Sequence, residues 1–183
     1  MRHGYVLGVV GLLACCSLLQ AKGVQGFDCW TLGMTRAEVK SCGQHGPFVD
    51  VRVTGGLETA NGDFEGTKTN ISFVFGSDRL IKIQVWLCEQ TDLETAVSSV
   101  TRAWRYLLRE FGQTKLAGTL LAIDTSVEEF QARARTLAAA LPPDKEDKFQ
   151  LGPVSKPDGA AVWASVFRDP KYGYYVFLFV AKP

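Results

Sequence analysis

Cysteine and histidine are the residues of this 183-residue chain most able to act as nucleophiles or metal ligands. His45 is the only histidine after residue 3, so the chain has no histidine-rich zinc site. Cys42 and His45 lie three positions apart and could together bind a metal, but a metal site needs further ligands that this spacing does not identify. We therefore predict no catalytic residue, no cofactor and no metal, and we expect His45 to be an exposed loop residue beside Gly46-Pro47.

Three cysteines follow the N-terminal apolar segment: Cys29, Cys42 and Cys88. In an oxidising compartment this number predicts one disulfide and one remaining thiol. A turn at Gly33 between a strand and a helix places Cys29 and Cys42 at comparable distances from the turn, because a strand rises about 3.3 Å per residue and a helix about 1.5 Å. We predict a Cys29–Cys42 disulfide, with Cys88 as a buried thiol. The alternative pairs Cys42 with Cys88.

The most unusual surface candidate is the segment from Tyr174 to Val180, which is apolar on both faces of a strand. Such a pattern is typical of a central strand that is covered on both sides. If helices cover only one side, Tyr175, Phe177 and Phe179 need another partner, which predicts a protein interface or an apolar groove. A strand buried in the core on both faces explains the pattern equally well.

The N-terminal segment has the pattern of a signal peptide. Uncharged, mostly apolar residues run from Tyr5 to Leu19, and Ala21-Lys22-Gly23 follows with the small-x-small pattern that a signal peptidase accepts. We predict a signal peptide over residues 1–23 and export to the periplasm, the cell surface or the extracellular space. Leu12-Leu13-Ala14-Cys15 resembles a lipobox, so acylation of Cys15, with attachment to the outer membrane, is the alternative. We expect no transmembrane segment in the mature chain, because each apolar run is shorter than about 18 residues.

Residues 24–183 have the length and composition of one domain. Removal of residues 1–23 takes away Arg2 and Lys22 and leaves 18 basic residues against 19 acidic ones. A balance near neutrality argues against nucleic acid as a partner. Eleven phenylalanines and four tryptophans supply material for a core. We predict a single domain.

Capping residues predict three helices. Asp92 and Gly112 bracket the strongest pattern of helical period in the chain. Thr35-Arg36-Ala37-Glu38 and Ser126-Val127-Glu128-Glu129 are capping boxes, which open two further helices. Pro142-Pro143 ends the last one.

Alternating apolar residues predict strands at 48–53, 71–75, 80–88, 161–168 and 174–182. Asn61-Gly62 predicts a hairpin turn within a polar segment over 54–68, and the prolines and glycines at about 142–160 predict a flexible loop. Helices and strands do not alternate strictly. This order indicates an α+β fold: an antiparallel sheet of about five to six strands with two or three helices packed mainly on one face.

Two segments carry a resemblance to small exported bacterial domains: Leu32-Gly33-Met34-Thr35-Arg36-Ala37-Glu38-Val39 and Phe73-Val74-Phe75-Gly76-Ser77-Asp78-Arg79-Leu80. They are similar to segments of the SmpA/OmlA outer-membrane assembly lipoproteins, the β-lactamase-inhibitor-like proteins and uncharacterised exported proteins. In such domains a Gly-Met-Thr turn precedes a short helix, and a Phe-x-Phe hairpin builds the sheet. The resemblance implies a noncatalytic binding or assembly role in the bacterial envelope and transfers no functional residues.

We therefore expect an exported envelope protein that is not an enzyme and that acts as a noncatalytic binding or assembly module, with another envelope protein as its partner. Membrane attachment is expected only if Cys15 is acylated. One alternative is a secreted inhibitor that inserts the segment Gly55–Lys68 into an enzyme cleft. The other is an enzyme of unidentified type that uses Cys88 or scattered carboxylates.

Overall fold

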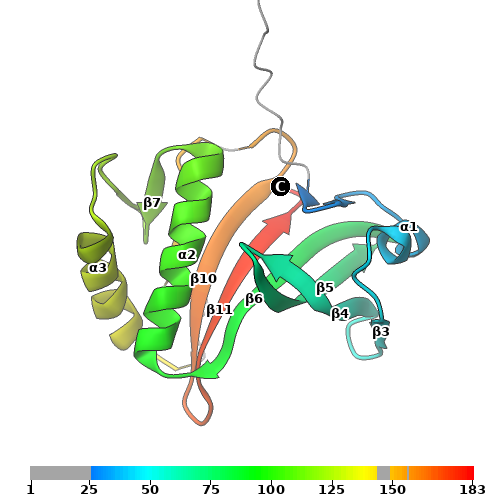
Figure 1. Cartoon of the computed structure of the whole chain (residues 1–183), viewed down its shortest axis with the longest axis horizontal. Helices are drawn as coiled ribbons and strands as arrows, with labels where there is room; N and C mark the ends of the chain where they lie inside the picture. Colours follow the sequence, from blue (N-terminus) through cyan, green and yellow to red (C-terminus); the bar gives the residue numbers. More distant parts are fainter. Residues whose placement is uncertain (1–25, 144–148, 156) are drawn as a thin grey trace, which may run out of the picture.

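The computed structural model describes residues 26–143, 149–155 and 157–183, which form eleven strands and three helices (Figure 1). The predicted signal peptide over 1–23 and its candidate acylation site, Cys15, lie outside these residues. Along the chain the elements are β1 (Gly26–Phe27), β2 (Trp30–Thr31), α1 (Arg36–Ser41), β3 (Phe48–Val51), β4 (Gly56–Phe64), β5 (Thr67–Gly76), β6 (Arg79–Thr91), α2 (Leu93–Phe111), β7 (Thr114–Leu116), β8 (Thr119–Leu120), α3 (Val127–Ala139), β9 (Gln150–Pro153), β10 (Ala161–Asp169) and β11 (Gly173–Ala181).

Most of these strands belong to one large sheet. Among the described residues, nine strands form an antiparallel sheet in the order β3-β4-β5-β6-β11-β10-β9-β7-β8, and β1 and β2 form a separate two-stranded sheet. The prediction of an α+β fold with about five to six strands and helices packed mainly on one face is therefore wrong; the structure is mostly β. Strands β7, β8 and β9 contain two to four residues each, too few to produce a period-two pattern in the sequence.

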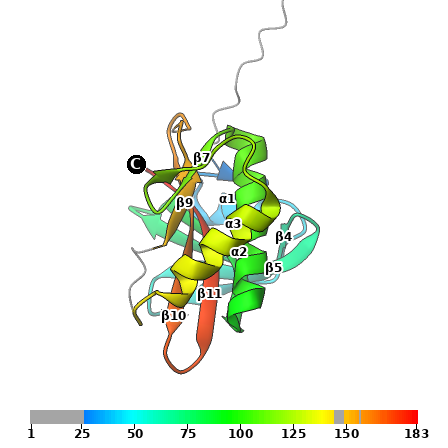
Figure 2. The same ribbon diagram turned by 90° about the vertical axis from the view of Figure 1, so that its left-hand side faces the viewer.

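The three helices lie in three different positions relative to the sheet. α2 packs against the central strands, whereas α3 packs mainly against α2 (Figure 2). α1 lies beside the N-terminal sheet, where the indole nitrogen of Trp30 donates a hydrogen bond to the Val39 carbonyl. The expected single layer of helices is thus replaced by one helix on the sheet, one on that helix and one at the N-terminal corner.

The centre of the sheet is the pair β6 and β11, which joins two hairpins that are distant in the sequence. Val85 lies opposite Leu178 and Ile83 opposite Val180, and all four side chains are fully buried. These residues contribute to the hydrophobic core together with Val100 and other side chains of α2. We refer to this side of the sheet as the inner face and to the opposite side as the outer face.

The sheet is strongly curved. Register shifts interrupt the pairing of β4, β5 and β11 with their neighbours, and such bulges bend and twist a strand. The β4–β5 hairpin curls over the inner face until its tip contacts α2 (Figure 1). There Arg109 Nη2 lies 2.8 Å from Glu65 Oε1, and the rings of Phe64 and Tyr106 lie 5.3 Å apart.

The helix predicted from Asp92 and Gly112 is present as α2. Asp92 caps it by accepting a hydrogen bond from the Thr95 amide at 2.9 Å. Gly112 ends it with a φ of 75°, a left-handed conformation that glycine adopts at little cost. The buried stripe of the helix includes Trp104, whose ring stacks on Phe130 of α3.

Two segments differ from what the sequence indicates. Asn61-Gly62 is not a turn but part of β4, and the chain reverses instead at Glu65-Gly66. Gly62 allows a close approach between strands, because a Cβ atom there would lie 2.3 Å from Ile71 Cδ1. Within the expected loop at 142–160, Gln150–Pro153 forms β9 and joins β10 to β7.

Candidate functional site

The N-terminal corner of the fold brings together the residues best suited to chemistry. Asp28 and Cys29 form the tight turn between β1 and β2, and Asp28 has a φ of 54°. Cys42 is the C-cap of α1, where its amide donates to the Val39 carbonyl. The sulfur atoms of Cys29 and Cys42 lie 2.02 Å apart, at disulfide-bonding distance, as the sequence predicts for this pair.

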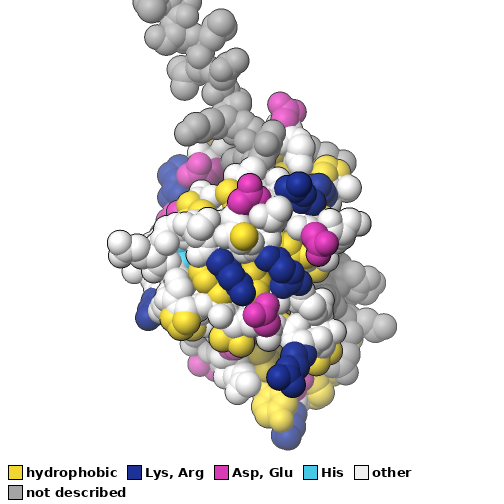
Figure 3. Space-filling view, turned by 90° about the vertical axis from the view of Figure 1, so that its right-hand side faces the viewer, with side chains coloured by type: hydrophobic (Ala, Val, Ile, Leu, Met, Phe, Trp, Pro, Cys, Tyr) yellow, Lys and Arg dark blue, Asp and Glu magenta, His cyan; other side chains and the backbone are white. Residues whose placement is uncertain are grey.

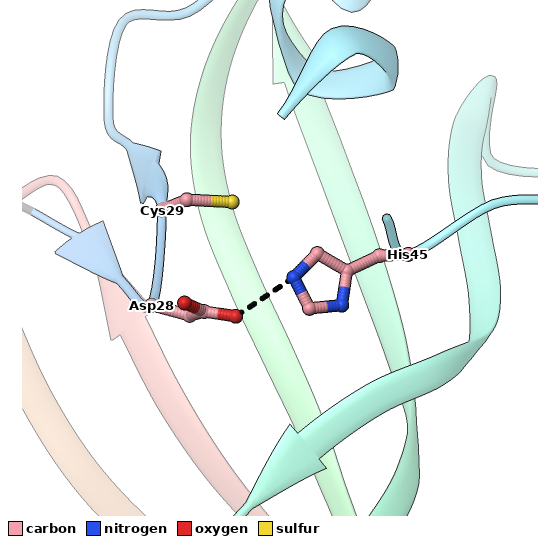
Figure 4. A group of neighbouring side chains, drawn as sticks. All are labelled: Asp28, Cys29 and His45. Carbon is pink, nitrogen blue, oxygen red and sulfur yellow. Dashed lines mark ion pairs between the residues drawn. The ribbon is translucent and has the colours of Figure 1, made fainter. Parts of the chain in front are cut away.

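His45 belongs to this corner and is not an exposed loop residue. Its Nε2 atom lies 2.9 Å from Asp28 Oδ2 (Figure 4). Its Nδ1 atom lies 3.0 Å from the carbonyl oxygen of Asn61. The ring packs against Trp30 with the centroids 4.6 Å apart, and only 18% of the side chain is exposed. The expectation of an exposed histidine is therefore wrong.

The two contacts of His45 restrict its proton positions. A carbonyl oxygen only accepts hydrogen bonds, so Nδ1 carries a proton when it contacts Asn61. An imidazolium would also donate from Nε2 to Asp28 and form a hydrogen-bonded ion pair. A neutral ring would instead direct the Nε2 lone pair toward Asp28 and Cys29. A protonated His45 therefore forms an ion pair with Asp28, whereas a neutral His45 presents Nε2 as a possible metal ligand.

The loop that carries His45 is held at both sides. Thr59 donates a side-chain hydrogen bond to the His45 carbonyl, and the Asn61 amide group donates one to the Gly46 carbonyl. Both donors come from β4, which fixes this loop against the sheet. Asp28 is the residue that the sequence analysis missed, since no spacing rule connects it with His45; only the β1–β2 turn brings the two together.

Cys88 is in a different environment. It lies on β6, is partly exposed and forms no disulfide. Burial raises the pKa of its thiol above the ordinary value of 9.0, although a hydrogen bond with Ser99 acts in the opposite direction. A raised pKa lowers the thiolate fraction at neutral pH and with it the nucleophilicity.

The second candidate site is on the outer face of the sheet. Tyr175, Phe177 and Phe179, the predicted interface residues, lie side by side on β11, with successive ring centroids 6.2 and 5.7 Å apart. Trp86 of β6 contacts Phe177, and two rings of β10 flank the same row. We call this set the aromatic face; its members are Trp86, Trp163, Phe167, Tyr175, Phe177 and Phe179.

Exposure varies across the aromatic face. Phe177 and Phe179 are only 7% and 5% exposed, because neighbouring rings and the ammonium group of Lys82 cover them. Tyr175, Trp86 and the two aromatic residues of β10 are partly exposed. The predicted interface residues therefore share one face, but the accessible part of that face is its rim.

A hollow of about 510 Å³ lies beside Trp163. Its lining includes Lys115, Gln150 and Gly152, and a Cβ atom at Gly152 would lie 3.7 Å from the Cβ atom of Trp163. This volume is within the usual range for pockets that accept small ligands or single side chains. A separate apolar groove of about 470 Å³ lies between α3 and β7.

Other surfaces mix apolar and charged residues. On the side that carries α1 and β3, hydrophobic side chains are interspersed with basic and acidic ones (Figure 3). Asp50 lies within 3.6 Å of Arg36 and 3.4 Å of Lys40, and Val49 on the edge strand β3 is 63% exposed. This side has no dominant charge.

In the part of the chain that the structure describes, no helix is long and apolar enough to cross a membrane. No protein-family model, no curated protein and no solved structure matches the chain.

Proposed function

We propose that this protein is an exported, noncatalytic binding module of the bacterial envelope that contacts a protein partner through the aromatic face. The main support for this proposal is the continuous row of aromatic rings on the outer face, next to the hollow at Trp163. Partly exposed aromatic residues are typical of binding energy hot spots. The proposal also rests on the signal-peptide pattern of residues 1–23.

The partner that fits this surface inserts an apolar side chain into the hollow beside Trp163. The ring of Trp163, which stacks on Phe179 with the centroids 4.9 Å apart, forms an apolar wall of this hollow. Lys115 lines the same hollow, and Lys82 lies over the Phe179 ring at 4.3 Å. An acidic residue beside the inserted side chain would complement the ammonium group of Lys115.

A noncatalytic role agrees with the chemistry of the described residues. Both ring nitrogens of His45 already have partners, and the Cys88 thiol has a raised pKa. An inhibitory loop over Gly55–Lys68 has less support, because most of this segment belongs to β4 and β5 and its tip contacts α2 through Arg109.

Site-specific photo-crosslinking in intact cells tests the proposal. A photoreactive residue replaces Tyr175 on the aromatic face or, as a matched control, Tyr172, which is 47% exposed in the β10–β11 turn. We expect one protein adduct from position 175 and none from position 172. The adduct should disappear when Trp163→Ala is added.

Thermal unfolding of each variant verifies that it is folded. Equal adducts from the two positions, or an adduct that survives Trp163→Ala in a folded chain, would contradict the proposal. The absence of any adduct at position 175 would contradict it as well.

A further inference from the structure

We propose that Asp28, Cys29, Cys42 and His45 form a zinc site once a dithiol has reduced the bond between the two cysteines. Ligand atoms of Asp28, Cys29 and His45 all lie within 4.8 Å of one another (Figure 4). The Cys42 sulfur lies 2.02 Å from that of Cys29 and so belongs to the same group. Two thiolates, an imidazole and a carboxylate are all ligands that zinc accepts. This inference does not depend on the aromatic face.

Zinc binding requires the ligand atoms to move to the distances of a tetrahedral site. In a tetrahedral zinc site the ligand atoms are roughly 3.3 to 3.8 Å apart, as follows from zinc–ligand distances of about 2.0 to 2.3 Å. The His45 Nε2 and Asp28 Oδ2 atoms, now 2.9 Å apart, would separate by a few tenths of an ångström. The two sulfur atoms would separate further after reduction. Their Cα atoms are 6.0 Å apart, so rotation of the cysteine side chains can supply this opening.

His45 has the environment of a metal-binding histidine. In such residues one ring nitrogen binds the metal while the other donates to a carbonyl or carboxylate, which fixes the tautomer. Here Nδ1 donates to the Asn61 carbonyl at 3.0 Å, and Nε2 is left facing Asp28 and Cys29. Trp30 packs against the ring and limits its rotation.

Reduction and zinc binding are coupled in a balanced reaction. The two thiols of the dithiol form a disulfide, and their two electrons cleave the Cys29–Cys42 bond. Zinc then binds both protein thiolates, and the two protons of the dithiol pass to solvent. Exchange with an oxidised dithiol, which takes up the two electrons and two protons from solvent, would re-form the Cys29–Cys42 bond and release the zinc. Disulfide and zinc are therefore mutually exclusive states of this corner.

Cobalt(II) substitution tests the site. The purified chain is reduced with a dithiol, separated from the excess without oxygen and titrated with Co²⁺. We expect one equivalent to bind with thiolate-to-cobalt charge-transfer absorption and with the visible bands of tetrahedral cobalt, and Zn²⁺ to displace it. His45→Gln and Asp28→Asn should each weaken binding by at least about tenfold, the smallest effect usual for residues that support a metal site.

Cys88→Ser is the matched control, because Cys88 is a thiol outside the corner; this variant should bind cobalt like the unmodified chain. The proposal is overturned if the oxidised chain binds equally well, if charge-transfer absorption is absent, or if His45→Gln has no effect. If reduction unfolds the chain, circular dichroism measures whether zinc restores the fold. Refolding on addition of zinc would then support the site, and failure to refold would overturn it.

Discussion

His45 Nε2 lies 2.9 Å from Asp28 Oδ2, and this contact joins the β1–β2 turn to the loop that leads into β3. The Cys29–Cys42 pair connects the same turn to the end of α1. Trp30, which is fully buried, packs against the His45 ring. Because the Asp28–His45 contact and the disulfide are formed by different side chains, substitutions can remove them separately.

Asp28→Asn removes the charge and keeps the backbone conformation, since asparagine tolerates the left-handed region that Asp28 occupies. We expect it to lower the free energy of unfolding by about 1 kcal/mol, because the contact to His45 is only partly exposed. Asp50→Asn is the control; its carboxylate is 66% exposed, and the expected loss is about 0.3 kcal/mol. Equal losses in urea unfolding would mean that the contact with His45 adds nothing.

The double variant Cys29→Ser/Cys42→Ser tests the disulfide. The cysteines are 13 positions apart, and closing a loop of this size stabilises a protein by about 3 kcal/mol in the chain-entropy account. We expect a similar loss in denaturant unfolding of the double variant. A reductant should destabilise the unmodified chain and Cys88→Ser but leave the double variant unchanged. An unmodified chain that is insensitive to reductant would exclude the bond.

Phe130→Ala tests the packing of α3 on α2. The Phe130 side chain is fully buried and stacks on Trp104, with the centroids 4.4 Å apart and the planes at 5°. Truncation leaves a cavity, so we expect a loss of about 3 to 5 kcal/mol in unfolding free energy. The milder Phe130→Leu should cost less, about 1 to 1.5 kcal/mol. Hydrogen exchange that is unchanged in α3 of the alanine variant would contradict this account.

The contact between Glu65 and Arg109 predicts a pH-dependent contribution to stability. Hydrogen bonds from Arg109 hold the pKa of Glu65 below its ordinary value of 4.5. A carboxyl whose pKa is lower in the folded chain stabilises the fold above the unfolded pKa, and this stabilisation is lost as the pH falls through the folded pKa. We expect Glu65→Gln to cost about 0.5 to 1 kcal/mol at pH 7, since the pair is partly exposed.

The difference between Glu65→Gln and the unmodified chain should shrink as the pH falls below 4.5. Unfolding in urea at a series of pH values measures it. Glu129→Gln is the control, because Glu129 pairs with Arg133 within α3 and not across elements. A difference that stays constant between neutral and acidic pH would show that the charge of Glu65 does not contribute.

Sequence patterns within a few residues predicted the helix ends and the alternation of side chains along a strand. Asp92 and Gly112 mark the ends of α2 because capping depends on residues within one helical turn. The capping box of Thr35 and Glu38 opens α1 for the same reason. The alternation along β11 also predicted which residues share a face, since side chains of a strand alternate regardless of its neighbours.

Pairing across the sheet was beyond local signals. Strand β4 is polar and contains Gly62, so the sequence pattern resembles a loop, but hydrogen bonds to both β3 and β5 make it a strand. Strand β9 pairs with β7, where Thr114 lies opposite Pro153, so this contact joins residues far apart in the chain. Neither the polar β4 nor these short strands show a period-two pattern that would predict their pairing.

By itself the sequence determined the helix ends, the two-sided apolar character of β11 and the preference of Cys29 for Cys42, because each depends on residues close together in the chain. Only the tertiary structure decided that Tyr175 and its aromatic neighbours lie on the outer face, since this depends on which side α2 packs. It also placed Asp28 against His45. That contact forms where the β1–β2 turn meets the loop that leads into β3 of the large sheet. Only the packing of these two segments against each other brings the two side chains together.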